Sequence, residues 1–234
     1  MTLTLVERDA GIAEYHFEVS VGTASVPGLL WMPAGSTKRQ ATVLIGHGRT
    51  GDKRTPYLLT LARRVAGRGW NAVAIDAPGH GERRAPDAGP DWPRPDANEA
   101  TSDWQAAIEY LRREADLDTE RLGYWGLSMG AALGISLIAG DHRIGAAVLG
   151  LSHANWPSPP GTRIRADAAS LTCPVLFIVN WDDRLVPRSQ AFELFDMIGG
   201  ADKRLHAYPG DHYELPDEAM TASEIFLARN LEAP

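Results

Sequence analysis

From residue 41 onward, short apolar segments alternate with longer segments whose apolar residues recur at the spacing of an α-helix. The short segments are typical of buried strands and occupy residues 43–45, 72–75, 121–125, 144–149, 175–179 and 205–208. Helices are expected near residues 58–67, 98–115, 131–138, 191–198 and 216–231. Strands joined through helices pair in parallel, so this alternation predicts a parallel sheet with helices on both faces.

The first part of the chain follows a different pattern. Residues 15–21 alternate between apolar and polar, a turn follows at Gly22, and residues 26–32 return as a second strand, which predicts an antiparallel start. The fold class expected is therefore α/β, with a mostly parallel eight-stranded sheet, antiparallel N-terminal strands and no lid domain. Because the chain has 234 residues and no segment that reads as a linker, we expect a single domain over residues 1–234.

A serine lies between a predicted strand and a predicted helix in the segment Gly126-Leu127-Ser128-Met129-Gly130. On such a sharp turn the serine is strained and its hydroxyl projects over the sheet edge, while glycines avoid collisions with the neighbouring strand and helix. The new helix also directs free N–H groups toward the space above the serine. The pentapeptide alone also fits an ordinary glycine-rich turn, but its strand and helix neighbours favour a nucleophilic serine.

A serine nucleophile needs a base to take its proton and an acid to orient that base. Downstream of Ser128, two carboxylates, Asp182 and Asp183, follow a predicted strand, and His212 lies in a turn after the last strand. Residues 152–166, after the preceding strand, contain no Asp or Glu. The order serine, carboxylate, histidine is the order of nucleophile, acid and base in α/β architectures of this kind.

Five motifs in a fixed order carry a family resemblance that extends from residue 14 onward. They are Gly46-His47-Gly48, Asp76-Ala77-Pro78-Gly79-His80-Gly81, the segment 126–130, Asp183-x-x-Val186-Pro187 and Gly210-Asp211-His212. In these motifs the chain resembles the α/β-hydrolase superfamily, and within it the small dienelactone-hydrolase-like serine esterases. Five motifs in the expected order are far more specific than any one of them.

The resemblance implies roles for individual residues. It assigns the acid to Asp183, four residues before the proline, and leaves Asp182 a capping or solvated role, with an exchange of the two as the alternative. It also implies an oxyanion hole formed by the backbone N–H groups of Arg49 and Met129. Strict dienelactone hydrolases use cysteine where this chain has Ser128, a difference that favours ordinary ester hydrolysis.

Two long connections, residues 79–97 and 152–168, leave strand ends at the edge where open α/β sheets bind ligands. Trp92 and Trp156 in these connections are candidate pocket residues. An equal alternative is that each aromatic ring packs on the protein surface and fixes its loop there. His153 and Trp181 are further candidates for substrate contact, although packing is favoured for His153. His47 and His80 lie beside glycines and are expected to hydrogen-bond the backbone.

Composition excludes several other functions. The formal net charge of −7 argues against nucleic-acid or anionic-membrane partners, and no apolar run is long enough to span a bilayer. A single cysteine, Cys173, excludes an internal disulfide and fits a reducing, cytoplasmic location. No motif indicates a metal, nucleotide or other cofactor, and the expected partner is a small-molecule ester. The oligomeric state is left open by the sequence.

The function expected is that of a carboxylesterase-type serine hydrolase, EC 3.1.1.-, acting on short-chain or small esters through an acyl-enzyme. The same triad also fits an amidase or peptidase, a C–C bond hydrolase or a perhydrolase. A non-catalytic ligand-binding protein is a third alternative, but such proteins commonly lack a triad member. Hydrolysis of a short p-nitrophenyl ester discriminates the third alternative from the others.

Overall fold

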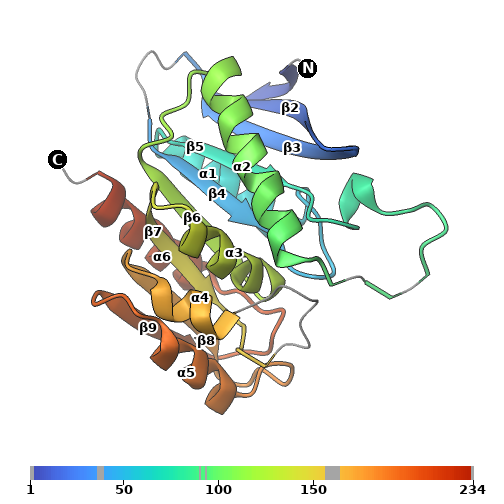
Figure 1. Ribbon diagram of the computed structural model, residues 1–234. Helices are drawn as coiled ribbons and strands as arrows, with labels where there is room; N and C mark the ends of the chain where they lie inside the picture. Colours follow the sequence, from blue (N-terminus) through green and yellow to red (C-terminus); the bar gives the residue numbers. More distant parts are fainter. Residues whose placement is uncertain (1–2, 36–39, 90, 93, 156–163, 233–234) are drawn as a thin grey trace.

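The computed structural model describes residues 3–35, 40–89, 91–92, 94–155 and 164–232. Within these residues, nine strands form one twisted sheet, in the order β1-β2-β3-β5-β4-β6-β7-β8-β9 (Figure 1). The strands are β1 (Thr4–Asp9), β2 (Ile12–Val21), β3 (Ala24–Pro33), β4 (Thr42–Gly46), β5 (Asn71–Ile75), β6 (Leu122–Leu127), β7 (Ile144–Gly150), β8 (Val175–Asn180) and β9 (Lys203–Tyr208).

The direction of pairing changes once across the sheet. The pairs β1–β2, β2–β3 and β3–β5 are antiparallel, whereas all pairs from β5–β4 to β8–β9 are parallel. The mixed sheet with antiparallel N-terminal strands that the sequence predicts is thus confirmed. Parallel strands end at the same edge, so β4, β6, β8 and β9 all deliver their following loops to one side of the molecule.

Helices cover both faces of the sheet. They are α1 (Pro56–Gly67), α2 (Ala97–Glu114), α3 (Met129–Gly140), α4 (Ile164–Ser170), α5 (Arg188–Met197) and α6 (Asp217–Leu231), with a 3-10 turn, η1 (Gly81–Arg83). Figure 1 shows α2, α3, α4 and α5 in front of the sheet and α1 and α6 behind it. Each face has its own apolar cluster. Trp104, Ile135 and Leu194 belong to the front one, and Leu61 and Leu227 to the other.

The local sequence of the long helix α2 determines where it begins and ends and which face it buries. Asp96 accepts hydrogen bonds from the backbone N–H groups of Asn98 and Glu99, at 2.8 and 3.1 Å, and so caps the first turn. Two arginines in the last turn complement the carboxyl end of the helix. Between these ends the buried residues recur at helical spacing, which fixes the face that packs on the sheet.

The sheet has one strand more than the eight expected. The additional strand, β1, pairs only with β2 at the sheet edge, and all six of its residues are exposed. It carries no buried face, so hydrophobic periodicity could not reveal it. In the part of the chain that the structure describes, no helix has the length and apolar character needed to cross a membrane.

Candidate active site

Ser128 occupies the turn between β6 and α3 in a backbone conformation that non-glycine residues rarely adopt, with φ of 57° and ψ of −120°. The turn is closely packed. A Cβ at Gly126 would lie 2.7 Å from the backbone of Gly130, and a Cβ at Gly130 would lie 2.4 Å from the carbonyl oxygen of Gly46. Glycine is therefore required at both positions, and the first turn of α3 packs directly against the end of β4.

The loops after β8 and β9 bring Asp183 and His212 to this serine. His212 Nε2 lies 3.0 Å from Ser128 Oγ, and His212 Nδ1 lies 2.7 Å from Asp183 Oδ2. The other oxygen of Asp183 accepts the backbone N–H groups of Leu185 and Val186, each at 2.8 Å. Both His212 and Asp183 are buried. The three residues predicted to act together are thus hydrogen-bonded in the expected order.

Contacts between these two loops fix the positions of Asp183 and His212 relative to each other. Arg184, which follows Asp183, donates from its guanidinium and its backbone N–H to the carboxylate of Asp211, which precedes His212. The guanidinium lowers the pKa of Asp211 to about 2. Asn180, fully buried at the end of β8, donates from Nδ2 to the carbonyl oxygens of Asp211 and Glu214, at 2.7 and 2.6 Å.

The loop after β4 carries Arg49, which lines the same cavity as Ser128, and His47 fixes the peptide group that links Gly48 to Arg49. Ala77 N–H donates to His47 Nε2 at 3.0 Å, so the proton of the neutral ring is on Nδ1, which donates to Gly48 O at 2.8 Å. A trans peptide points its N–H opposite to its C=O. Fixing the carbonyl of Gly48 therefore also fixes the direction of the N–H of Arg49.

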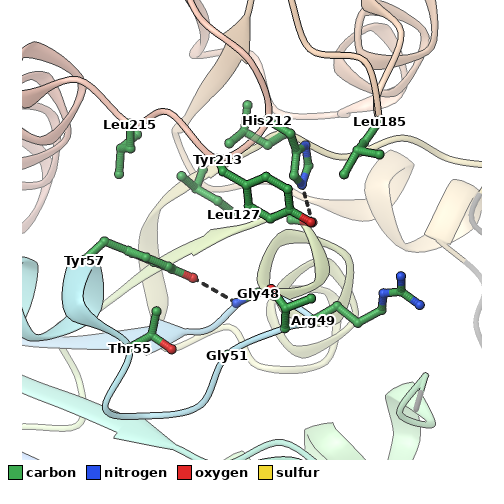
Figure 2. A pocket seen from close by; sticks show the side chains of 13 residues that line it. Gly48, Arg49, Gly51, Thr55, Tyr57, Leu127, Leu185, His212, Tyr213 and Leu215 are labelled. Atoms are coloured by element: carbon green, nitrogen blue, oxygen red, sulfur yellow. Dashed lines mark hydrogen bonds between the residues drawn. The ribbon is translucent and has the colours of Figure 1, made fainter. Parts of the chain in front are cut away.

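Two further side chains hold the same loop. The Tyr57 hydroxyl accepts the backbone N–H of Gly48 at 2.9 Å, a contact that Figure 2 shows from within the pocket. Burial raises the pKa of Tyr57 to about 12, so the hydroxyl stays protonated over the range in which hydrolases work. His80 Nε2 lies 2.8 Å from the carbonyl oxygen of Arg49, and His80 Nδ1 lies 3.0 Å from that of Pro78.

A buried ion cluster anchors the far end of this loop. Lys53 Nζ donates to Asp76 Oδ2 at 2.6 Å and to Glu82 Oε1 at 2.5 Å, and Lys53 N–H donates to the second oxygen of Asp76 at 2.9 Å. Asp76 also accepts the N–H of Glu82. Lys53 and Asp76 are almost completely buried, and a buried charge is stable only when it is paired in this way. The cluster ties the β4–α1 loop to the loop after β5.

The burial of His47 predicts a measurable dependence of stability on pH. Burial lowers the pKa of His47 from 6.5 to about 4. Between these values the unfolded chain binds a proton that the folded chain does not, so the free energy of unfolding rises with pH in this window and is unaffected above it. In urea unfolding experiments, we expect the free energy of unfolding of wild type to fall by about 2 kcal/mol more than that of His47→Gln when the pH is lowered from 7 to 5. Parallel pH profiles of the two proteins would contradict a buried, neutral His47.

Ser128 opens onto a cavity of about 240 Å³. It is lined by Gly48, Arg49, Thr50, Gly51, Thr55, Tyr57, Leu127, Ser128, Leu151, Leu185, His212, Tyr213 and Leu215. Figure 2 shows Tyr57, Leu127 and Leu215 on one side of this cavity and Leu185 and Arg49 on the other. Met129 is not part of the lining, but as the first residue of α3 it directly follows Ser128 and places its N–H at the start of the helix.

The other candidate substrate contacts do not line this cavity. The Trp92 ring stacks on the His80 ring, with centroids 5.5 Å apart, and Arg84 Cζ lies 4.3 Å from the Trp92 ring centroid, so Trp92 supports the loop that carries His80. Trp181 lies under the guanidinium of Arg188 in a separate hollow. His153 is buried and accepts the N–H of Asn155 at 3.1 Å. Trp156 lies outside the described residues.

Several residues around the site carried no signal in the sequence. Tyr57 and Lys53 act through contacts with Gly48 and Asp76, and nothing in their spacing marks them as partners. Leu185 and Tyr213 are adjacent to predicted site residues, and this adjacency is the one signal that could have identified them. His47 and His80, in contrast, bond to the backbone as their glycine-flanked positions predict.

Comparisons with known proteins agree with this architecture. A structure of a cold-adapted esterase from an Arctic intertidal metagenomic library, with polyethylene glycol bound, is 35% identical over 96% of this chain and 97% of that chain, with a TM-score of 0.85. A Klebsiella pneumoniae protein assigned as a dienelactone hydrolase, 16% identical over 95% of this chain and 99% of that chain with a TM-score of 0.79, shows the fold alone. An uncharacterized Mycobacterium tuberculosis protein is 26% identical over 203 residues, 80% of this chain and 68% of that protein.

The mixed sheet, the serine turn after β6 and the similarity to a solved esterase define an α/β-hydrolase. The chain belongs to the family described as serine aminopeptidase, S33, whose model matches residues 37–157, slightly more than half of the chain. The resemblance to α/β-hydrolase esterases that the sequence motifs indicate is thereby confirmed.

Proposed function

We propose that this protein is a serine carboxylesterase that hydrolyses small esters through a covalent acyl-enzyme. The observation that carries the proposal is the continuous hydrogen-bonded series from Ser128 Oγ through His212 to Asp183, with distances of 3.0 and 2.7 Å. This series opens onto a cavity that a small ester can enter. Its esterase relative of 35% identity supports the same reaction class.

In the first half of the reaction, His212 Nε2 takes the proton of Ser128 as Oγ attacks the ester carbonyl carbon. Asp183 stabilises the resulting imidazolium through Nδ1. When the tetrahedral intermediate collapses, the ester C–O bond breaks and the proton on Nε2 passes to the departing alcohol oxygen. In the second half, His212 deprotonates a water molecule that attacks the acyl-enzyme, and the proton returns to Ser128 as the acid is released.

The oxyanion of the tetrahedral intermediate is bound by the backbone N–H groups of Arg49 and Met129 in this proposal. The fixed carbonyl of Gly48 supports the role of Arg49, because donors that are already oriented need no reorganisation during the reaction. Met129 contributes the free N–H of the first helical position. The side chains of both residues are not part of this chemistry.

The size of the cavity supports a small acyl group. Its volume of about 240 Å³ is below the range of about 300–1,000 Å³ that is typical of sites for drug-sized ligands. Each CH₂ that remains outside forgoes about 0.8 kcal/mol of binding. We therefore expect kcat/KM for p-nitrophenyl esters to be highest from acetyl to butyryl and to fall beyond about six to eight carbons, without activation at an oil–water interface. Palmitoyl esters as the best substrates would contradict a small acyl site.

The family description raises aminopeptidase activity as the alternative, and the cavity argues against it. An aminopeptidase has to bind a substrate ammonium group, for which a carboxylate is the natural partner. Among the described residues that line the cavity there is no Asp or Glu, and Arg49 would repel a cation. We expect p-nitrophenyl acetate to be hydrolysed and the p-nitroanilides of alanine and leucine to be left intact. Faster cleavage of the anilides would replace the esterase proposal.

A further inference from the structure

Two exposed apolar side chains lie at the edge of the cavity. The exposed large hydrophobic side chains of the described residues are Leu5, Val6, Trp181, Leu185, Tyr213 and Ile225, and of these Leu185 and Tyr213 line the cavity that contains Ser128. Their exposed fractions are 53% and 74%. Single exposed hydrophobic residues are ordinary, but two at the entrance of one cavity form an apolar rim that a ligand can cover.

This rim is attached to the predicted base and acid. The Tyr213 ring packs edge-on against the imidazole of His212, with ring centroids 5.2 Å apart and an interplanar angle of 88°. Leu185 donates its backbone N–H to Asp183, so its position is fixed relative to the same imidazole. In the view of Figure 2, Leu185 and the Tyr213 ring lie on either side of His212.

The chemistry of ester cleavage gives this rim a role. The proton on His212 Nε2 has to reach the departing alcohol oxygen, so this oxygen lies next to Nε2 and its carbon substituent contacts whatever flanks the imidazole. Tyr57, Leu127 and Leu215 are less exposed than Leu185 and Tyr213, so the more enclosed part of the cavity is left for the acyl group. The alcohol half of the substrate therefore meets Leu185 and Tyr213.

We propose that Tyr213 and Leu185 determine specificity for the alcohol half of the ester, and that the protein prefers esters of apolar, ring-bearing alcohols. The proposal rests on the esterase function proposed above. An aromatic ring covering Tyr213 removes apolar surface of both partners from water and permits ring-on-ring contact. A cationic alcohol gains no ion pair, because the described residues that line the cavity include the cation Arg49 and no Asp or Glu.

The test compares benzyl acetate with methyl acetate. Both esters form the same acetyl-enzyme, and their alcohols are of similar acidity, so the ratio of their kcat/KM values reports contacts of the alcohol group during acylation. Any general disturbance of His212 cancels in this ratio. We expect benzyl acetate to be favoured about tenfold by wild type, and we expect Tyr213→Ala and Leu185→Ala each to lower the ratio about three- to fivefold.

Two matched variants sharpen the test. Tyr213→Phe keeps the ring and should keep the ratio. Ile225→Ala removes an apolar side chain of α6 whose exposed fraction lies between those of Leu185 and Tyr213 and which does not line the cavity, so it should also leave the ratio unchanged. An unchanged ratio in Tyr213→Ala and Leu185→Ala, or equal hydrolysis of the two esters by wild type, would overturn the alcohol preference while leaving the esterase function intact. Failure to hydrolyse either ester would instead contradict the esterase function and the preference together.

Discussion

Replacing Ser128 with alanine is expected to lower kcat for p-nitrophenyl acetate by about 10⁴-fold or more. The substitution removes the oxygen that lies 3.0 Å from His212 Nε2, and with it the covalent pathway. The oxyanion donors and the cavity remain, so a small residual rate above the uncatalysed reaction should persist. Because alanine replaces a hydroxyl that points into the cavity, the free energy of unfolding should change little.

Covalent labelling provides a second measurement of the same assignment. A fluorophosphonate probe should lose fluoride as Ser128 Oγ bonds to its phosphorus, and mass spectrometry should locate the label at this residue alone. Ser136→Ala is a matched control, since Ser136 lies in α3, the helix that follows Ser128, and its hydroxyl donates a hydrogen bond to Asp167. This control should label and turn over like wild type. Labelling that persists in Ser128→Ala, or that maps to Ser152, would remove Ser128 from the role of nucleophile.

Much of the fold could be predicted from the sequence because buried strands and amphipathic helices carry periodic signals. The strands from β4 to β8 are apolar over most of their length, and α1, α2 and α6 lie close to the expected ranges. The strand β1 was missed because none of its residues is buried. The seven-residue helix α4 begins within the connection 152–168 and extends to Ser170, and two turns of helix give too few repeats for a periodic pattern.

Some residues of the candidate site could likewise be predicted from the sequence, and others could not. Ser128, Asp183 and His212 could be predicted because each lies in the turn or loop that follows a parallel strand, and parallel strands bring these ends together. Tyr57 and Lys53 could not, since their partners depend on how a loop folds back on itself. The role of Trp92 could not be decided from the sequence, because an aromatic residue in the loop after β5 can equally line a pocket or hold the loop in place. In the structure its neighbours are His80 and Arg84.

Asp183→Asn is expected to lower kcat by about 10³- to 10⁴-fold. The carboxylate acts only as an acceptor, with Oδ2 toward His212 Nδ1 and Oδ1 toward the N–H groups of Leu185 and Val186. Asparagine has one acceptor and one donor. If its NH₂ group faces His212, the imidazole must carry its proton on Nε2 and cannot accept the proton of Ser128. If the NH₂ group faces the two backbone amides, donors oppose donors and the loop that positions the acid is distorted.

The neighbouring Asp182→Asn provides the matched control for this prediction. Asp182 is exposed, and its Oδ2 lies 3.4 Å from the N–H of Gly210, a contact that the amide oxygen of asparagine can replace. We expect a loss of less than about tenfold in kcat, because an exposed interaction of this kind contributes little. The two variants carry the same change, from a carboxylate to an amide, at adjacent positions, so steady-state kinetics on p-nitrophenyl acetate compares them directly. If Asp182→Asn were the more damaging substitution, the acid would be Asp182. Equal and severe losses in two folded variants would mean that both carboxylates support His212.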